Sequence, residues 1–399
     1  MPSIQPPLSE FSVINKQGGA LLLYGYEPSG HAAAAEAIQE QFKITYSNLF
    51  PINRVNISSD LHPILGPAIA KTYLKIIQKT PALWEYLYDN RKIAEMAEEL
   101  RKIYLFLGGS KLRNKIRASN PDLIICTHAL PCGVIASEKQ RGNVTTPLVA
   151  VLTDFAIHTY WIHTQVDLYL VPTPHFIAPL MERGVPEHKI QATGIPIHPN
   201  FQEPTDPEAI RKKLGFSSDP VLFLSGGSKG MGSIEQIIEV LLHKIPKAQI
   251  LIPCATNKKL LQTLQLKYAK HPQIQSYPFL SPSQMKELLY ASDLLIGKAG
   301  GMTLAEALSV GLPMVFLDPL PGQEDRNADF LVQQKTAIKV QDISHLGETI
   351  SALLRQSDSL EKMRYHAKLL GCPNSTQKAQ ITIAQKIKIP SLLDSATKI

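Results

Sequence analysis

Short apolar runs alternate with helical patterns along the first half of the chain. Runs rich in β-branched residues and bounded by turn residues predict buried strands at Ala20–Tyr24, Lys43–Ser47, Asp122–Thr127, Leu148–Thr153 and Leu168–Pro172. An alanine-rich stretch from His31 to Gln41 predicts a helix directly after the first strand, and residues 58–116 are mostly helical by pattern. Strands that alternate with helices indicate a parallel sheet with crossover helices.

The same alternation restarts after a proline-rich segment between Gly194 and Asp206, which is typical of an interdomain linker. Beyond it, strands are predicted at Pro220–Ser225, Gln249–Pro253, Leu294–Gly297 and Met314–Leu317, and helices at Ser233–His243 and Thr303–Ser309. The pattern therefore predicts an α/β protein with two Rossmann-like domains, at 1–200 and 201–370. A helical tail at 371–399 is expected to pack back on the first domain.

Composition agrees with two domains of this kind, because 399 residues are too many for one ordinary core. No apolar run approaches the roughly 18–20 residues that a membrane-spanning helix needs. The first residues lack the basic and apolar regions of a signal peptide. The four cysteines lack metal-site spacing and indicate a reducing compartment.

The net charge is +7, and positive charge is concentrated between residues 100 and 121. This stretch contains no acidic side chain. Its cations include Arg101, Lys102, Lys111 and Arg113, and large apolar residues lie between them. Such a stretch can bind an anionic membrane surface. A solvated helix explains the charge equally well, whereas nucleic acid is less favoured because no nucleic-acid-binding motif accompanies it.

A glycine-rich loop follows the predicted strand Pro220–Ser225 and precedes a helix. Gly226, Gly227 and Ser228 lie at its start, where backbone N–H groups and a helix dipole can hold a diphosphate. A tight turn between strand and helix is the alternative, because one such loop is weak evidence.

A second strand–loop–helix junction starts at Gly297 and strengthens the interpretation of the first. It offers a cation at Lys298, flexible backbone at Gly300 and Gly301, a hydroxyl at Thr303 and a carboxylate at Glu306. A carboxylate that faces the cleft can accept both hydroxyls of a ribose. The spacing of Thr303 and Glu306 also fits a capping box, which is the structural alternative.

A polar loop is predicted at Pro321–Asn327, after the next strand. Gln323 and Glu324 have the bidentate side chains that bind vicinal hydroxyls of a hexose, and Arg326 and Asn327 are long or polar enough to reach phosphate. All these loops follow strands, so they are expected to meet at one edge of the sheet and to form a sugar-nucleotide site.

The first domain offers two candidate general bases. His31 opens a helix after the first strand, where a neutral imidazole can take a proton from an acceptor hydroxyl; the alternative is a histidine that caps or packs the helix start. Asp154 ends a buried strand and is either the competing base, an orienting group or a cap. Trp161 follows in a loop that is expected to contact the acceptor or lipid. No Asp-x-Asp pair is present to hold a metal-bound diphosphate, so we expect catalysis without a metal or cofactor.

Seven motifs in order along the chain carry a family resemblance: Gly30–Ala37, Thr153–Phe155, Gly194–Ile197, Ser225–Gly232, Lys298–Thr303, Glu306–Ala307 and Pro321–Asn327. With them the sequence resembles the GT-B glycosyltransferases of the monogalactosyldiacylglycerol synthase and processive diacylglycerol glucosyltransferase family (glycosyltransferase family 28). The resemblance implies two Rossmann-like domains whose parallel sheets face an interdomain cleft.

The resemblance also implies roles for individual residues. Gly226, Gly227 and Ser228 would face the diphosphate, Glu306 the ribose, and Gln323 and Glu324 the hexose. Asn257 joins the donor-binding set, because Cys254–Asn257 stands where the family has a glycine-containing turn.

The reaction implied by the resemblance is an inverting transfer of a hexose from UDP-glucose or UDP-galactose to diacylglycerol, which gives a β-glycosyl diacylglycerol. The enzyme would act as a peripheral protein at the cytoplasmic face of an anionic membrane. The alternatives are another lipid acceptor (a sterol or a polyprenyl-linked sugar), a UDP-sugar 2-epimerase, and a non-catalytic nucleotide-sugar- or lipid-binding protein. The sequence leaves open glucose or galactose, the base, processivity and the oligomeric state.

Overall fold

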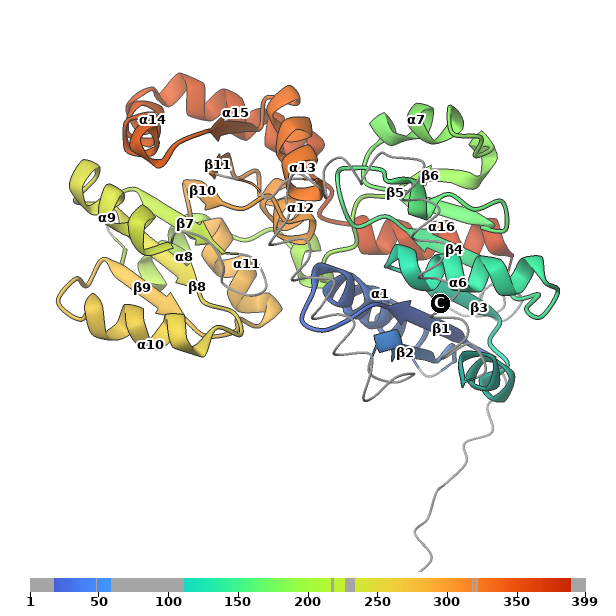
Figure 1. The fold of residues 1–399 in the computed structure, drawn as a ribbon. Coiled ribbons are helices and arrows are strands. Elements are labelled where there is room, and N and C mark those ends of the chain that lie inside the picture. The colour runs from blue at the N-terminus through green and yellow to red at the C-terminus, as the bar shows by residue number, and fades with distance from the viewer. Residues whose placement is uncertain are drawn as a thin grey trace, which may run out of the picture.

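The computed structural model describes residues 18–47, 49–58, 111–216, 219–226, 234–317, 319 and 322–388. Two six-stranded sheets form the centres of two lobes that lie side by side (Figure 1). The first sheet has the order β2-β1-β3-β4-β5-β6, and all its pairs are parallel. Its strands are β1 (Ala20–Tyr24), β2 (Ile52–Asn56), β3 (Leu123–Cys126), β4 (Leu148–Val151), β5 (Leu168–Val171) and β6 (Ile190–Ala192).

The second sheet has the order β12-β11-β10-β7-β8-β9 and is also parallel throughout. Its strands are β7 (Val221–Ser225), β8 (Gln249–Pro253), β9 (Ile274–Tyr277), β10 (Leu294–Gly297), β11 (Met314–Leu317) and β12 (Ala337–Val340). Strands β7, β10 and β11 are buried at every position, because helices cover both faces of the sheet. The predicted α/β class and GT-B arrangement are confirmed.

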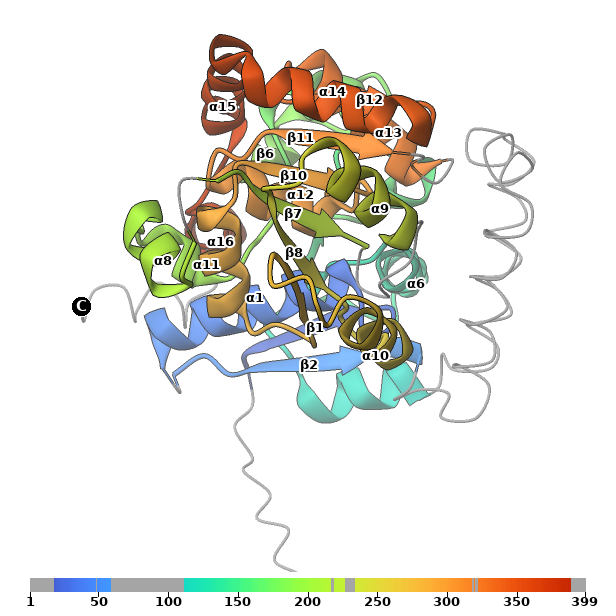
Figure 2. The same cartoon turned by 90° about the vertical axis from the view of Figure 1, so that its left-hand side faces the viewer.

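Helices surround both sheets, as the two views in Figures 1 and 2 show. In chain order they are α1 (Gly30–Tyr46), residues 111–119, α6 (Ala129–Gln140), α7 (Ile177–Met181), α8 (Pro207–Lys213), α9 (Ile234–Lys244), α10 (Lys258–Lys267), α11 (Pro282–Ala291), α12 (Gly301–Ser309), α13 (Gln323–Gln333), α14 (Ile343–Arg355), α15 (Ser357–Leu370) and α16 (Ser375–Ile387). Short 3₁₀ turns occur at Thr159–Trp161, Pro174–Phe176, Glu187–Lys189 and Pro199–Gln202.

The strand predicted at Lys43–Ser47 is wrong, because helix α1 continues to Tyr46. Ile38, Phe42 and Tyr46 are buried at helical spacing, whereas Ile44 is 61% exposed. The apolar residues of this segment therefore belong to one helix face rather than to two strand faces. The strand that pairs with β1 on this side is β2, which begins at Ile52.

Helix α16 returns to the first sheet, and Figure 1 shows it beside β4 and α6. Ala379 and Ile383 pack in the same core as β1 and β5. The Gln380 side chain donates to the Tyr46 hydroxyl at 2.5 Å, and the Ser375 hydroxyl accepts from the Ile197 amide at 3.3 Å. The last described helix is therefore part of the N-terminal lobe in space.

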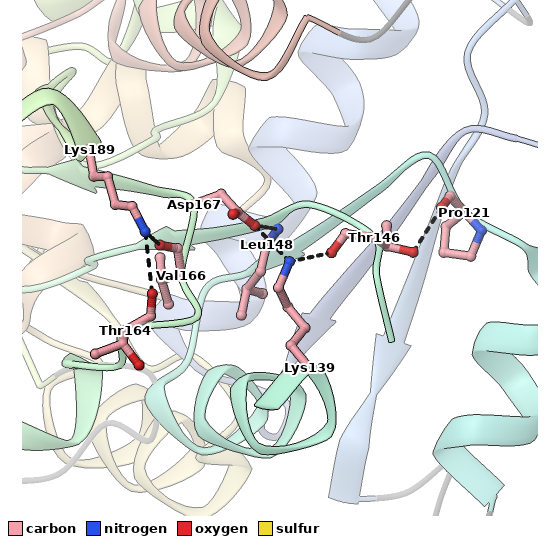
Figure 3. A network of polar contacts seen from close by, with 8 residues as sticks. All are labelled: Pro121, Lys139, Thr146, Leu148, Thr164, Val166, Asp167 and Lys189. Carbon is pink, nitrogen blue, oxygen red and sulfur yellow. Dashed lines mark hydrogen bonds and ion pairs between the residues drawn. The ribbon is translucent and has the colours of Figure 1, made fainter. Parts of the chain in front are cut away.

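A polar network connects the amino ends of the neighbouring strands β4 and β5 to the end of α6 (Figure 3). The Lys139 ammonium donates to the Thr146 carbonyl and to the Asp167 carboxylate, both at 2.8 Å. Asp167 also accepts from the Leu148 amide at 2.7 Å. These contacts stabilise the amino ends of β4 and β5. The candidate site residues lie at the opposite, carboxyl ends of the strands.

Among the helices within the described ranges, none combines the length and apolar character that crossing a bilayer requires.

Candidate active site

The carboxyl ends of the two sheets face each other across the boundary between the lobes. A Cβ atom added to Gly30 at the start of α1 would lie 3.3 Å from the Met302 Cβ in α12. A Cβ added to Gly301 would lie 2.7 Å from an Asp154 carboxylate oxygen. The start of α12 therefore touches the segment that follows β4, and the predicted site residues of both halves meet there.

His31 lies at this boundary in the first turn of α1. Its Nδ1 atom is 2.9 Å from the Thr127 carbonyl and 2.7 Å from the Thr153 hydroxyl oxygen. A carbonyl only accepts, so Nδ1 carries the hydrogen and Nε2 keeps its lone pair. Burial lowers the pKa of His31 to about 4, so the imidazole is neutral at pH 7. The helix cap is Ser29, whose side chain accepts from the Ala32 amide, so His31 is not the cap.

Two further histidines, His128 and His158, stand near His31. His158 belongs to the loop that was expected, with Trp161, to contact the acceptor or lipid, whereas no role was predicted for His128. The His128 ring is 4.5 Å from the His31 ring in an edge-on contact, and its Nδ1 accepts from the Leu130 amide. Burial lowers the pKa of His128 well below its usual range, and His31 and His158 lower it further. Burial also lowers the pKa of His158 to about 3. His128 lies shortly after buried strand β3, as Asp154 lies shortly after β4. That position was the sequence feature that could have marked His128 as a candidate site residue.

Asp154 is 9% exposed and is bonded to the C-terminal lobe. Its Oδ1 atom accepts from the Asn327 amide group at 3.1 Å, and the Gln323 side chain also bonds to it. Burial raises the pKa of Asp154 to about 7, against the opposite effect of these two hydrogen bonds, and the nearby Glu324 charge raises it further. Asp154 thus links the lobes rather than capping a helix.

Helix α12 presents its amino end to the cleft. Gly300 is the cap residue and makes no side-chain cap bond, and the helix begins at Gly301. Thr303 therefore lies inside the first turn, so the capping-box alternative for Thr303 and Glu306 is wrong. A Cβ on Gly300 would meet no atom of the described residues within 4 Å, so these residues leave this side of the helix end open to an anion, which the helix dipole favours.

Gly301 differs from its neighbour, because it is packed against Thr153 and Asp154. Lys298 is half-buried directly after β10, and its amide donates to the Ser225 carbonyl at 3.2 Å. Gly226 is buried at the end of β7, while Gly227 and Ser228 lie outside the described residues.

Glu306 lies in the second turn of α12. Burial alone raises its pKa to about 8, so the carboxyl group is largely protonated at pH 7. Within the described ranges its carboxyl group has no hydrogen-bond partner. A carboxyl group in this state has full capacity for the hydroxyls of a ligand.

The predicted loop at Pro321–Asn327 is a helix from Gln323 onward. Gly322 is the cap residue with a φ of 93°, a left-handed conformation that favours glycine, and it turns the chain into α13. Gln323 and Glu324 consequently lie in the first helical turn, half-buried at the cleft.

The expectation that Asn327 reaches phosphate is wrong for this structure. Asn327 is 0% exposed, and its Nδ2 atom donates to the Ala299 carbonyl at 3.0 Å and to Asp154 at 3.1 Å. Both N–H groups are used inside the protein. Asn257 has a capping role, because its side chain accepts from the Leu260 amide at the start of α10.

Two acceptor-side expectations also need correction. Trp161 is 2% exposed and packs in the core of the first lobe, so it does not contact acceptor or lipid here. Arg113 is 3.3 Å from the buried carboxylate of Glu138, so its charge is paired within the protein rather than offered to a membrane. Lys111 is exposed, whereas Arg101 and Lys102 lie outside the described residues.

The arrangement of two parallel sheets around this boundary defines the GT-B class, and solved structures support it. The S. aureus MnaA co-structure with UDP matches with a TM-score of 0.62 at 15% identity, over 94% of this chain and 97% of the other. MurG from Acinetobacter baumannii matches with a TM-score of 0.55 at 15% identity, over 92% and 99%. At such low identity these likenesses establish the fold.

Sequence comparison identifies the family. Residues 31–197 match the monogalactosyldiacylglycerol (MGDG) synthase family, and residues 221–381 match the C-terminal domain of glycosyltransferase family 28. The processive diacylglycerol β-glucosyltransferase of Bacillus pumilus is 30% identical over 91% of this chain and 94% of its own length. The enzyme of the same description from Bacillus subtilis is 29% identical over the same shares. The chain belongs to glycosyltransferase family 28, with the monogalactosyldiacylglycerol synthases and processive diacylglycerol glucosyltransferases.

Proposed function

We propose that the protein transfers glucose or galactose from the corresponding UDP-sugar to diacylglycerol and inverts the anomeric configuration to give a β-glycosyl diacylglycerol. The observation that carries the proposal is the neutral His31 imidazole, whose Nδ1–H is held by Thr127 and which lies beside Gly30, where α1 meets α12 at Met302. The description of the Bacillus relatives supports diacylglycerol as acceptor and glucose as the transferred sugar.

His31 is the better of the two candidate bases. Its Nδ1–H is held by Thr127 and Thr153, which orients Nε2 toward an acceptor hydroxyl. Burial causes the low pKa of His31, and a bound diphosphate would raise that pKa by favouring the imidazolium. The Asp154 oxygens are instead engaged by Asn327 and Gln323, which suits a positioning role.

The donor would lie against the C-terminal lobe. The open amino end of α12 at Gly300 suits the diphosphate, and Lys298 adds a cation. Glu306 would bind the ribose, and Gln323 and Glu324 the hexose. These groups supply hydrogen bonds and positive charge for the departing UDP, so we propose that no metal is required.

Access to the lipid would come from peripheral contact with an anionic membrane at its cytoplasmic face. In the helix at 111–119, Lys111 and Arg117 are exposed. Cations near such a surface contribute about 1 kcal/mol each.

The direct test is incubation of the protein with UDP-glucose or UDP-galactose and diacylglycerol in anionic vesicles, followed by thin-layer separation and determination of anomeric configuration. We expect a β-linked product from at least one donor, with an unchanged rate in EDTA. Absence of lipid product from both donors would refute the proposal. Conversion of UDP-N-acetylglucosamine to its 2-epimer without lipid would favour the epimerase alternative.

A further inference from the structure

A buried amide joins three segments at the boundary between the lobes. The Nδ2 atom of Asn327 in α13 donates to the Ala299 carbonyl, which lies in the donor loop between Lys298 and Gly300, and to Asp154 after β4. Asn327 has no solvent exposure, so water cannot replace either bond in this arrangement of the lobes. A buried donor that loses its acceptor costs more than the hydrogen bond itself contributes.

One turn further along α13, an aromatic contact continues the same helix face. The Phe330 ring stacks on Phe155 with centroids 5.7 Å apart and an interplanar angle of 13°. It also contacts Phe176 at 5.1 Å and the His175 ring at 5.7 Å. Phe155 and Phe176 are buried, so Phe330 fills an apolar recess of the opposite lobe.

The two contacts are in register. Asp154 and Phe155 are adjacent in the chain, whereas Asn327 and Phe330 are three residues apart and therefore on one face of α13. Gly301 makes room for this approach, because any side chain there would collide with Thr153 and Asp154. One helix face thus carries both a polar and an apolar contact to the same short segment of the other lobe.

The contact reaches the donor side through Gln323. This residue lies one turn before Asn327, and its side chain bonds to the same Asp154 carboxylate. The hydrogen bond that orients the Gln323 side chain therefore depends on the contact between α13 and the segment after β4. The ribose and diphosphate groups proposed above lie in the C-terminal lobe. Among the described residues, Phe330 makes no bond to them, whereas Asn327 also holds the donor loop through the Ala299 carbonyl.

We propose that Asn327 and Phe330 form an interlobe latch with Asp154 and Phe155, and that Asn327 is a positioning residue that places Gln323 for sugar transfer. This inference rests on the proposed function for its consequence in catalysis. The latch itself is a statement about the arrangement of the lobes and can be tested without turnover.

The test uses the full chain and three variants: Asn327→Ala, Phe330→Leu and, as a matched control on the exposed face of α13, Asp329→Ala. Small-angle scattering measures the radius of gyration, calorimetry measures UDP affinity, and the vesicle assay measures kcat and KM for the UDP-sugar. Misplacement of a reacting group by about 1 Å costs on the order of 100-fold in rate. We expect a larger radius of gyration and a loss of about that size in kcat/KM for Asn327→Ala, and a smaller change of the same kind for Phe330→Leu.

UDP affinity should change by less than about threefold in Phe330→Leu and Asp329→Ala, and this result also shows that the C-terminal lobe is folded in these variants. In Asn327→Ala the affinity falls further than in Phe330→Leu, because the bond to the Ala299 carbonyl in the donor loop is lost as well. Wild-type dimensions together with wild-type kcat/KM in Asn327→Ala would overturn the latch. A parallel loss of UDP affinity and kcat/KM in Phe330→Leu would also overturn it, since Phe330 would then support the donor lobe alone. If the wild type makes no glycolipid while the two latch variants still expand, the proposed function fails and the latch stands.

Discussion

Replacement of Asp154 by asparagine should stabilise the protein above neutral pH. Burial raises the pKa of this carboxyl group from 3.8 to about 7, so the folded state binds its proton more tightly than the unfolded state. The folded state therefore loses stability as pH rises from about 4 to about 7, and the loss is complete above that range. A shift of about 3 pKa units corresponds to roughly 4 kcal/mol, as an upper bound. Asparagine keeps an oxygen that accepts from Asn327 and never carries the charge.

The assay is urea unfolding of wild type and Asp154→Asn at several pH values, with Asp329→Asn as an exposed control. The stability difference between variant and wild type should be roughly 1–2 kcal/mol at pH 5 and should rise to roughly 4 kcal/mol at pH 8. Tyr26 and Glu324 also face Asp154, but they are present in both proteins and largely cancel in the difference. A difference that does not change with pH would refute the reasoning, because it would mean that Asp154 titrates normally.

Three further predictions concern the donor loop and the membrane. Burial raises the pKa of Glu306 to about 8, and ribose hydroxyls that bond to the carboxylate should lower that pKa. UDP binding at pH 7 should therefore release a proton, and UDP affinity should increase as pH rises from 6 to 8. Calorimetry in two buffers of different ionisation enthalpy measures the proton release, and a wild type indistinguishable from Glu306→Gln would contradict the prediction. Gly301→Ala should reduce the rate of sugar transfer on the order of 100-fold while UDP still binds, because the new methyl group collides with the Thr153 carbonyl oxygen of the other lobe. Wild-type turnover in this variant would rule out the close approach of α12 to Thr153. Lys111→Glu with Arg117→Glu should reduce flotation with anionic vesicles but not with neutral ones, and equal binding to both would exclude this surface.

The parts of the fold that the sequence predicts well are its buried strands. Leu294–Gly297 and Met314–Leu317 are wholly apolar apart from glycine and are buried at every position, so their bounds could be predicted. Edge strands such as β9, which is half-buried throughout, give no comparable pattern and were missed. The continuation of α1 to Tyr46 depended on which face met the sheet, and a short apolar run does not encode that.

The site divides in the same way. His31 and Asp154 follow strands of a parallel sheet, so their place at its carboxyl edge could be predicted from local pattern. The partner of Asn327 is Asp154, which is 173 residues away, and only the packing of the two lobes brings them together. The same holds for Trp161, whose burial depends on how its loop folds back on the core.

In the proposed mechanism, His31 removes the proton of the acceptor hydroxyl. The most direct measurement is kcat of His31→Ala in the vesicle assay, with UDP affinity measured on the same protein. General bases contribute about 10²- to 10⁴-fold, so we expect a loss of that size with UDP affinity within about threefold of wild type. Turnover equal to that of the wild type would contradict the account and would remove His31 as the base.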